Sequence, residues 1–125
     1  MSSTPSAAEL SFVEIPTGDR RGLVAWYVEM LGLVVVLDDP AGDFTLLDAG
    51  PTRLAIKGGR EEPASGSIAL VFRVEDVEAM RGRLVGRGLV VSEPADSPEG
   101  YRAIRLDDPA GHPIRVFHWL PDGPQ

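Results

Sequence analysis

Two stretches of equal length decide the fold: Phe12-Val-Glu-Ile-Pro-Thr-Gly-Asp19 and Ala69-Leu-Val-Phe-Arg-Val-Glu-Asp76. Each stretch is apolar and alternating, which is typical of a β-strand, and each ends in an aspartate. When one half of the chain is slid onto the other, the first and last residues of the two stretches superpose. This coincidence indicates an internal duplication.

A helix is predicted after each aspartate. Apolar residues recur at spacings of three and four over residues 23–31 and again over residues 77–85, so each helix has one buried stripe. Asp19 and Asp76 stand at the N-cap positions, where a carboxylate accepts hydrogen bonds from the first free N–H groups of a helix. The two halves therefore share a strand, a cap and a helix in the same order.

Each predicted helix ends at a glycine that precedes a valine-rich strand, Gly32–Val36 in one half and Gly88–Val91 in the other. Further strands are predicted at residues 44–47, 53–57, 102–106 and 113–119. The order is therefore β-α-β-β-β, twice. We expect one domain over residues 1–125, with module one at about 9–58, module two at about 67–120 and a connector at 58–66.

Composition limits the classes of function. At 125 residues and 43% hydrophobic content, the chain suffices for one ordinary core. The absence of cysteine excludes disulfides, thiolate catalysis and cysteine-ligated metals. A net charge of −7 argues against nucleic acid or an anionic membrane as a partner. Because no apolar stretch approaches the roughly 20 residues of a membrane-spanning helix, we expect a cytoplasmic protein.

Three features occur together: the duplicated β-α-β-β-β order, Trp26-Tyr27 followed by Leu31-Gly32-Leu33, and Asp107-Asp108-Pro109-Ala110-Gly111 before the last strand. In this combination the chain resembles the vicinal oxygen chelate superfamily of glyoxalases, extradiol dioxygenases, fosfomycin-modifying enzymes and bleomycin resistance proteins. The resemblance implies an α+β fold in which the modules form a curved mixed sheet, a half-barrel around a cleft, with helices on the convex face. It also implies a homodimer.

Metal-dependent members of this superfamily carry His, Gln or Glu ligands on the first and last strands of each module. The resemblance places those positions on Phe12 and Ala69 and on Ala55 and Arg115. None of these side chains binds a divalent cation, and a guanidinium repels one. We therefore expect neither a metal nor another cofactor. A register shift of one or two residues is the alternative that would restore a ligand.

The histidines do not provide a substitute site. His112 lies in a predicted turn, and alternation places His118 on the opposite side of its strand from Arg115. Glu14 shares the face of Phe12, but one carboxylate without partners is a poor metal site. No catalytic residue is assigned, although Glu14 remains a conceivable general acid or base.

Strand alternation separates an apolar face, expected under the helices, from a mixed face suited to a ligand cleft. Arginine binds carboxylate or carbonyl oxygens in a planar fork, and aromatic rings offer flat contact area, so a flat, anionic or carbonyl-rich ligand fits. The predicted ligand-binding residues are Phe12, Glu14, Ala55, Lys57, Ala69, Arg73, Arg115, Phe117 and Trp119. The alternative for the basic residues is that they lie at strand ends and extend into water.

The function that follows is a metal-independent binding protein of the glyoxalase/bleomycin resistance type. It would sequester an aromatic or anionic metabolite or an antibiotic in the clefts of a homodimer. One alternative is a lyase, isomerase or dioxygenase of the same superfamily with a non-standard site. Another is a structural or regulatory module whose sheet edges dock a second chain.

Overall fold

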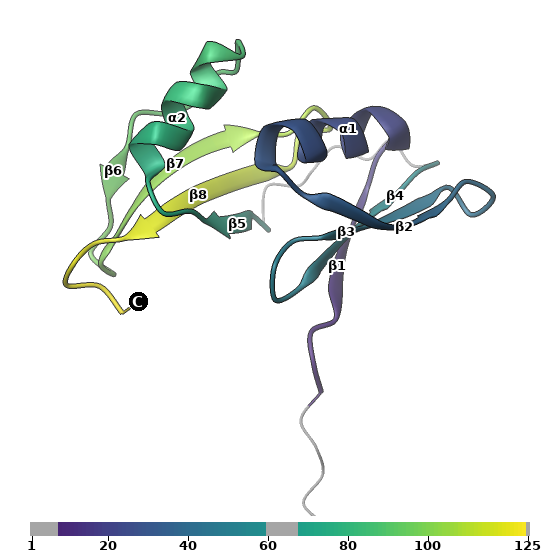
Figure 1. The fold of residues 1–125 in the computed structure, drawn as a ribbon, viewed down its shortest axis with the longest axis horizontal. Helices are drawn as coiled ribbons and strands as arrows, with labels where there is room; N and C mark the ends of the chain where they lie inside the picture. Colours follow the sequence, from purple (N-terminus) through teal and green to yellow (C-terminus); the bar gives the residue numbers. More distant parts are fainter. Residues whose placement is uncertain (1–7, 60–67, 125) are drawn as a thin grey trace, which may run out of the picture. The chain divides into compact units, whose positions relative to one another are not determined.

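The computed structural model describes residues 8–59 and 68–124, and the chain divides into two compact units, Met1–Glu62 and Pro63–Gln125 (Figure 1). The first unit contains β1 (Phe12–Pro16), α1 (Arg20–Leu31), β2 (Val34–Asp39), β3 (Phe44–Asp48) and β4 (Arg53–Lys57). The second contains β5 (Leu70–Arg73), α2 (Val77–Gly86), β6 (Ala95–Asp96), β7 (Tyr101–Asp107) and β8 (Pro113–Trp119). The predicted β-α-β-β-β order is confirmed in both units. Of the predicted connector, only Gly58 and Gly59 are among the described residues.

Each unit is a four-stranded mixed sheet with the same topology. The strand orders are β1-β4-β3-β2 and β5-β8-β7-β6, and the first strand of each unit runs parallel to the last. In the parallel pairs, Glu14 lies beside Ala55, and Val71 lies beside Arg115. The repeated topology confirms the α+β class and the duplication.

One face of each sheet is covered by the helix of its own unit. In the first unit, Leu23, Trp26 and Tyr27 of α1 are buried, as are Leu54 and Ile56 of β4. In the second, the stripe of α2 is buried together with alternate residues of β7 and β8; these residues are Val77, Met80, Leu84, Ile104, Ile114 and Val116. Alternation therefore leaves the opposite face of each sheet free of its own helix.

Both helices have the predicted caps. The Asp19 carboxylate accepts a hydrogen bond from the Gly22 N–H at 3.0 Å, and Asp76 accepts one from Ala79 at 3.1 Å. Gly32 and Gly88 follow the helices with φ of 73° and 87°, in the left-handed region that favours glycine. In the described part of the chain, no helix is long and apolar enough to cross a membrane.

The predicted strand at Gly88–Val91 is wrong. The second strand of this unit is β6, which begins four residues later, and Val90 is 93% exposed. Ser92 is the physical reason, because its N–H donates to the Arg105 carbonyl while its hydroxyl accepts the Arg105 N–H. A side chain thus replaces a backbone carbonyl in the ladder. Pro94 then lacks an N–H to extend the pairing.

Arg20, in the first turn of α1, forms a partly buried ion cluster that the sequence did not indicate. Its side chain is 7% exposed and donates to Asp43 at 2.8 Å, Asp38 at 2.6 Å and the Thr45 hydroxyl at 2.6 Å. Thr45 in turn donates to Asp38 at 2.8 Å. This cluster ties the start of α1 to the hairpin of β2 and β3.

The sequence Leu-Asp-Asp-Pro-Ala-Gly occurs twice, at residues 37–42 and 106–111, and forms two different turns. In the β2–β3 turn, Asp39 is exposed and accepts one hydrogen bond, from the Gly42 N–H at 3.2 Å. In the β7–β8 turn, the fully buried Asp108 carboxylate accepts from the N–H groups of Ala110 and His112. The repeat is therefore not part of the duplication.

Candidate functional site

The open face of the second sheet carries an aromatic cluster. Register places Tyr101 of β7 opposite Trp119 of β8, and Phe117 is two residues before Trp119 on the same side of the strand. The ring centroids of Phe117 and Trp119 are 5.0 Å apart, and Tyr101 lies 5.4 Å from Phe117 and 6.1 Å from Trp119. All three pairs are edge-to-face, the arrangement that aromatic rings prefer.

Arginines continue this face beyond the aromatic rings. Arg115 of β8 lies directly opposite Arg105 of β7, and Arg73 of β5 lies beside Phe117. The predicted residues Arg73, Arg115, Phe117 and Trp119 therefore share one face of one sheet. Their placement agrees with the predicted alternation, but it does not test whether they bind a ligand.

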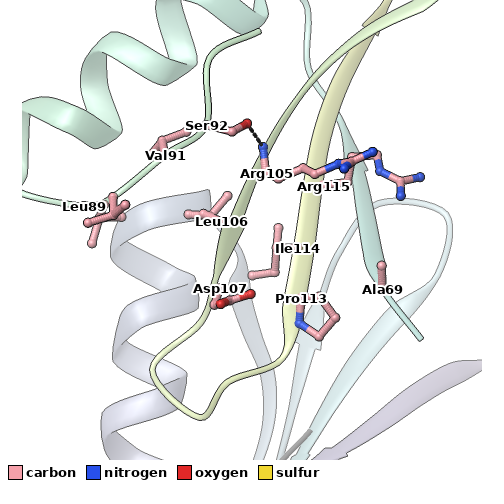
Figure 2. A pocket seen from close by; sticks show the side chains of 11 residues that line it. Ala69, Leu89, Val91, Ser92, Arg105, Leu106, Asp107, Pro113, Ile114 and Arg115 are labelled. Atoms are coloured by element: carbon pink, nitrogen blue, oxygen red, sulfur yellow. Dashed lines mark hydrogen bonds between the residues drawn. The ribbon is translucent and has the colours of Figure 1, made fainter. Parts of the chain in front are cut away.

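A cavity of about 560 Å³ lies where β7 ends and β8 begins (Figure 2). Figure 2 shows Arg105 and Arg115 extending in the same direction, with Asp107 away from them beyond Leu106 and Ile114. The lining residues are Ala69, Leu89, Val90, Val91, Ser92, Arg105, Leu106, Asp107, Pro113, Ile114 and Arg115. Of the predicted site residues, Ala69 and Arg115 thus line a cavity.

A second cavity, of about 350 Å³, lies on the same unit and shares Ser92, Arg105 and Arg115 with the first. Tyr101 and Ala103 of β7 also line it, together with Glu93 and residues 95–98 around β6. Phe117 and Trp119 line neither cavity but adjoin the second one through their contacts with Tyr101. The two arginines therefore stand where the cavities meet.

Sequence reasoning missed Tyr101, Arg105 and Ser92. Tyr101 and Arg105 could have been found from the β7–β8 hairpin, because alternation fixes which β7 residues share the face of Arg115 once the turn is located. No sequence pattern of this kind pointed to Ser92. Its role depends on the irregular segment before β6, which was predicted as a regular strand.

The predicted site residues of the first unit lie on the open face of its own sheet. Phe12 is 43% exposed and makes an edge-to-face contact with Phe44 at 6.4 Å between ring centroids. Lys57 donates from Nζ to the Gly42 carbonyl in the β2–β3 turn. Glu14 is exposed, whereas its neighbour Ala55 is fully buried.

A cleft shared by both modules stays a prediction, as does the role of Phe12, Glu14, Ala55 and Lys57 in ligand binding. The register of β1 and β4 places Glu14 beside Ala55, one of the positions at which the superfamily's enzymes carry a metal ligand. A single carboxylate does not form a divalent-metal site by itself.

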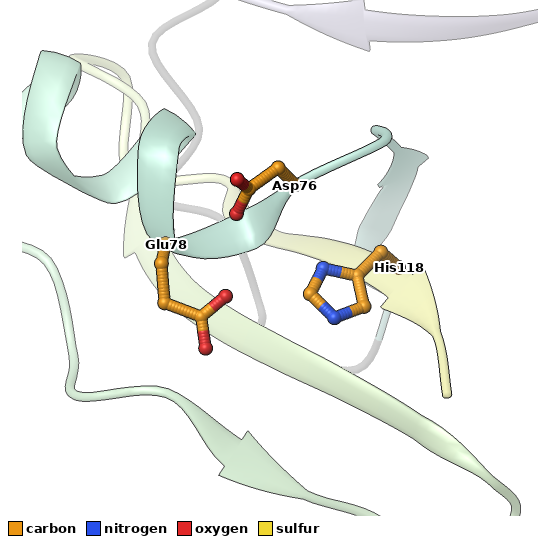
Figure 3. A group of neighbouring side chains, drawn as sticks. All are labelled: Asp76, Glu78 and His118. Atoms are coloured by element: carbon orange, nitrogen blue, oxygen red, sulfur yellow. The ribbon is translucent and has the colours of Figure 1, made fainter. Parts of the chain in front are cut away.

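One group of side chains in the second unit has the composition of a metal site: Asp76, Glu78 and His118 (Figure 3). Their potential ligand atoms lie within 4.8 Å of one another. Each side chain already has a protein partner. The Val77 N–H donates to His118 Nδ1 at 2.8 Å, Ala79 donates to Asp76, and Arg102 donates to Glu78 at 2.7 Å.

The imidazole of His118 therefore acts as a second acceptor at the start of α2. Because Nδ1 accepts a hydrogen bond, the neutral ring carries its proton on Nε2, and neither nitrogen offers a free lone pair to a metal. Hydrogen bonds from Arg102, first to Asp96 and then to Glu78, raise the pKa of this arginine and reflect a surface ion network. The group is best explained as the N-terminal cap of α2.

Comparison with known proteins gives a consistent result. A family model described as a glyoxalase-like domain matches residues 12–117. A glyoxalase/bleomycin resistance protein/dioxygenase from Nocardioides is 24% identical, with a TM-score of 0.77, and the match covers 98% of this chain and 91% of that one. No functionally curated protein matches the sequence.

Two further solved structures have more specific names. The antibiotic-binding protein TnmS3 from Streptomyces sp. CB03234 is 25% identical, with a TM-score of 0.78, and the match covers 93% of this chain and 99% of that one. A lactoylglutathione lyase from Agrobacterium tumefaciens is 22% identical, with a TM-score of 0.72, and the match covers 93% and 96% of the two chains. One fold thus carries both a binding protein and an enzyme.

Proposed function

The chain belongs to the glyoxalase-like domain family, within the vicinal oxygen chelate superfamily, and from this premise we propose that it binds a small organic molecule without a metal ion. The observation that carries the proposal is the open face of the second unit, where an aromatic cluster adjoins the smaller of two neighbouring cavities. Cavities of this size fall within the range of about 300–1,000 Å³ that holds small ligands in proteins.

The residues at the superfamily's metal positions support binding without a metal. Arg115 stands at one of these positions and brings a permanent positive charge to it. Ala55 and Ala69 have no donor atom in their side chains, and Phe12 has none either. The likeness to TnmS3, an antibiotic-binding protein, supports an antibiotic or a similar small molecule as the ligand. The rings of Tyr101, Phe117 and Trp119 support a flat aromatic group on it.

The proposal is tested by a ligand screen that reads out the second unit alone. The chain has two tryptophans, and Trp26 is a buried residue of α1, so Trp26→Phe leaves Trp119 as the only tryptophan whose fluorescence is measured. We expect flat aromatic compounds that raise the thermal midpoint of unfolding to quench the fluorescence of Trp119 as well. Tyr101→Ala should weaken their binding about tenfold, because it removes the ring that contacts Trp119 and lines the smaller cavity.

The matched control is Tyr27→Phe, which changes a buried tyrosine of the first unit and should leave affinity unchanged. Ligands that bind Tyr101→Ala as tightly as the native protein would contradict the proposed face. A diverse library without a single compound that raises the thermal midpoint would contradict a binding function altogether.

We further propose that the protein is a homodimer. Support comes from β2, an edge strand whose apolar residues Val34, Val35, Val36 and Leu37 are between 44% and 64% exposed. An exposed apolar edge strand readily pairs with another chain. The cytoplasmic location and the exclusion of nucleic acid stay predictions.

Val34→Lys tests the dimer, because an edge lysine is a common means by which proteins block strand pairing. We expect light scattering to report a dimer for the native protein and a monomer for the variant. Val90→Lys is the control, since this valine is still more exposed but lies outside the edge strand. A native monomer at micromolar concentration would disprove the proposal.

A further inference from the structure

Arg105 and Arg115 form an in-register pair of like charges on the open face of the second sheet. Residues directly opposite each other on antiparallel strands have Cβ atoms about 5 Å apart, and like charges in this position destabilise a sheet. Neither guanidinium forms an ion pair or a side-chain hydrogen bond with the described residues. The pair is therefore an unfavourable arrangement unless something else neutralises it.

Arg115 carries a second unfavourable feature. Its Nε atom is buried and has no hydrogen-bond partner among the described residues, although a buried donor in a native protein is nearly always paired. An acceptor from outside this unit would satisfy the buried donor. A negatively charged acceptor would relieve the repulsion between the two guanidinium groups as well.

Nearby carboxylates of the second unit do not take this role. Glu93 pairs with Arg81 at 3.2 Å, and Asp96 pairs with Arg102 at 2.6 Å. Glu99 accepts a hydrogen bond from the Ser97 hydroxyl, which is the main reason that its pKa is lowered; the charge of Arg115 contributes the least. Ion pairs thus occupy Glu93 and Asp96, whereas Glu99 interacts with Arg115 through its charge but forms no ion pair with it.

We propose that Arg105 and Arg115 together bind the carboxylate of an organic acid whose apolar body occupies the larger cavity. This inference rests on the proposed function and names the chemical class of the ligand. Ser92 holds Arg105 in place by exchanging two hydrogen bonds with its backbone, of 2.9 and 2.8 Å. The rest of the cavity wall is largely apolar; its apolar residues include Leu89, Val90, Val91, Leu106 and Ile114.

Asp107 limits the number of negative charges that a ligand of this cavity can carry. It lines the same cavity and lies on the same side of β7 as Arg105, two residues further along, and Figure 2 shows its carboxylate away from the arginines. A second anionic group on the ligand would be repelled there. The site therefore favours a monocarboxylate with an apolar or aromatic body over a dicarboxylate or a phosphate.

The test compares 2-naphthoate with its neutral amide and with inorganic phosphate, by calorimetric titration of the full-length protein. We expect 2-naphthoate to bind at least tenfold more tightly than 2-naphthamide and phosphate to bind weakly. Arg105→Met and Arg115→Met should each abolish the preference for the acid. Arg21→Met, at an exposed arginine of α1 that lines neither of these two cavities, is the control and should change the preference less than about threefold.

Thermal unfolding without ligand provides a second readout. Since the pair is repulsive, Arg105→Met should leave the midpoint unchanged or raise it, whereas an arginine with a structural role would give a lower midpoint. Equal affinity for acid and amide would overturn the arginine subsite. The proposed binding function is judged separately, by the ligand screen that monitors Trp119 fluorescence. If that screen finds neutral ligands, the binding function stands without the arginine site. If it finds no ligand, both the binding function and the arginine site are contradicted.

Discussion

Replacing Asp108 with alanine is expected to lower the free energy of unfolding by about 3 kcal/mol and the thermal midpoint by roughly 10 °C. The buried carboxylate accepts the Ala110 N–H at 2.8 Å and the His112 N–H at 3.0 Å, and it bonds to His112 Nδ1 at 2.8 Å. Alanine would leave these buried donors without an acceptor. Chemical denaturation monitored by circular dichroism measures the change.

The turn of the first unit that has the same six-residue sequence offers a matched control. Asp39→Ala alters the same position of the same Leu-Asp-Asp-Pro-Ala-Gly sequence, but it removes one exposed hydrogen bond and should cost less than about 1 kcal/mol. Because the Asp108 turn joins β7 to β8, its loss should also disturb the pairing of Arg105 with Arg115. Equal effects of the two substitutions would show that burial of Asp108 does not matter.

Arg20→Met should lower the thermal midpoint by roughly 5–10 °C, because the methionine fills the space of the arginine stem but removes the hydrogen bonds that Arg20 donates to Asp38, Asp43 and Thr45. Arg20→Lys should recover little of this loss, since one ammonium group does not reproduce the fork that reaches three acceptors. The exposed neighbour Arg21→Met is the control. A midpoint that stays within 1 °C of native would contradict the structural role of the cluster.

The same cluster predicts how stability depends on pH. A hydrogen bond from Thr45, followed by the hydrogen bond and charge of Arg20, lowers the pKa of Asp38 below its ordinary value of 3.8. A carboxyl whose pKa is lowered by folding stabilises the protein fully above that ordinary value and loses the contribution as pH falls through the lowered pKa. Arg20→Met should therefore lose less stability than the native protein between pH 5 and pH 2.

Periodicity and capping residues were sufficient to predict most of the fold. The strand-aspartate-helix-glycine pattern located β1, α1, β5 and α2, and its repetition gave the two modules. Each of these signals is local, because an N-cap carboxylate or a left-handed glycine acts within a few residues of its own position. The alternation of β8 likewise placed Arg115, Phe117 and Trp119 on one face.

The features that were missed depend on contacts between distant residues. Ser92 replaces a strand pairing by binding the backbone of Arg105, so a valine-rich segment that reads as a strand is not one. Arg20 reaches residues that lie 18–25 positions along the chain. The Arg105–Arg115 pair depends on the register of the β7–β8 hairpin, which the sequence alone did not fix.

Metal analysis of untagged, purified protein tests the central claim most directly, because every part of the proposed function assumes a ligand site without a metal ion. Elemental analysis should find nickel, zinc, manganese and iron far below one atom per chain. Stoichiometric metal would contradict the account. It would mean that the assigned positions are out of register and that an enzyme of the superfamily, such as a lyase, isomerase or dioxygenase, should be sought instead.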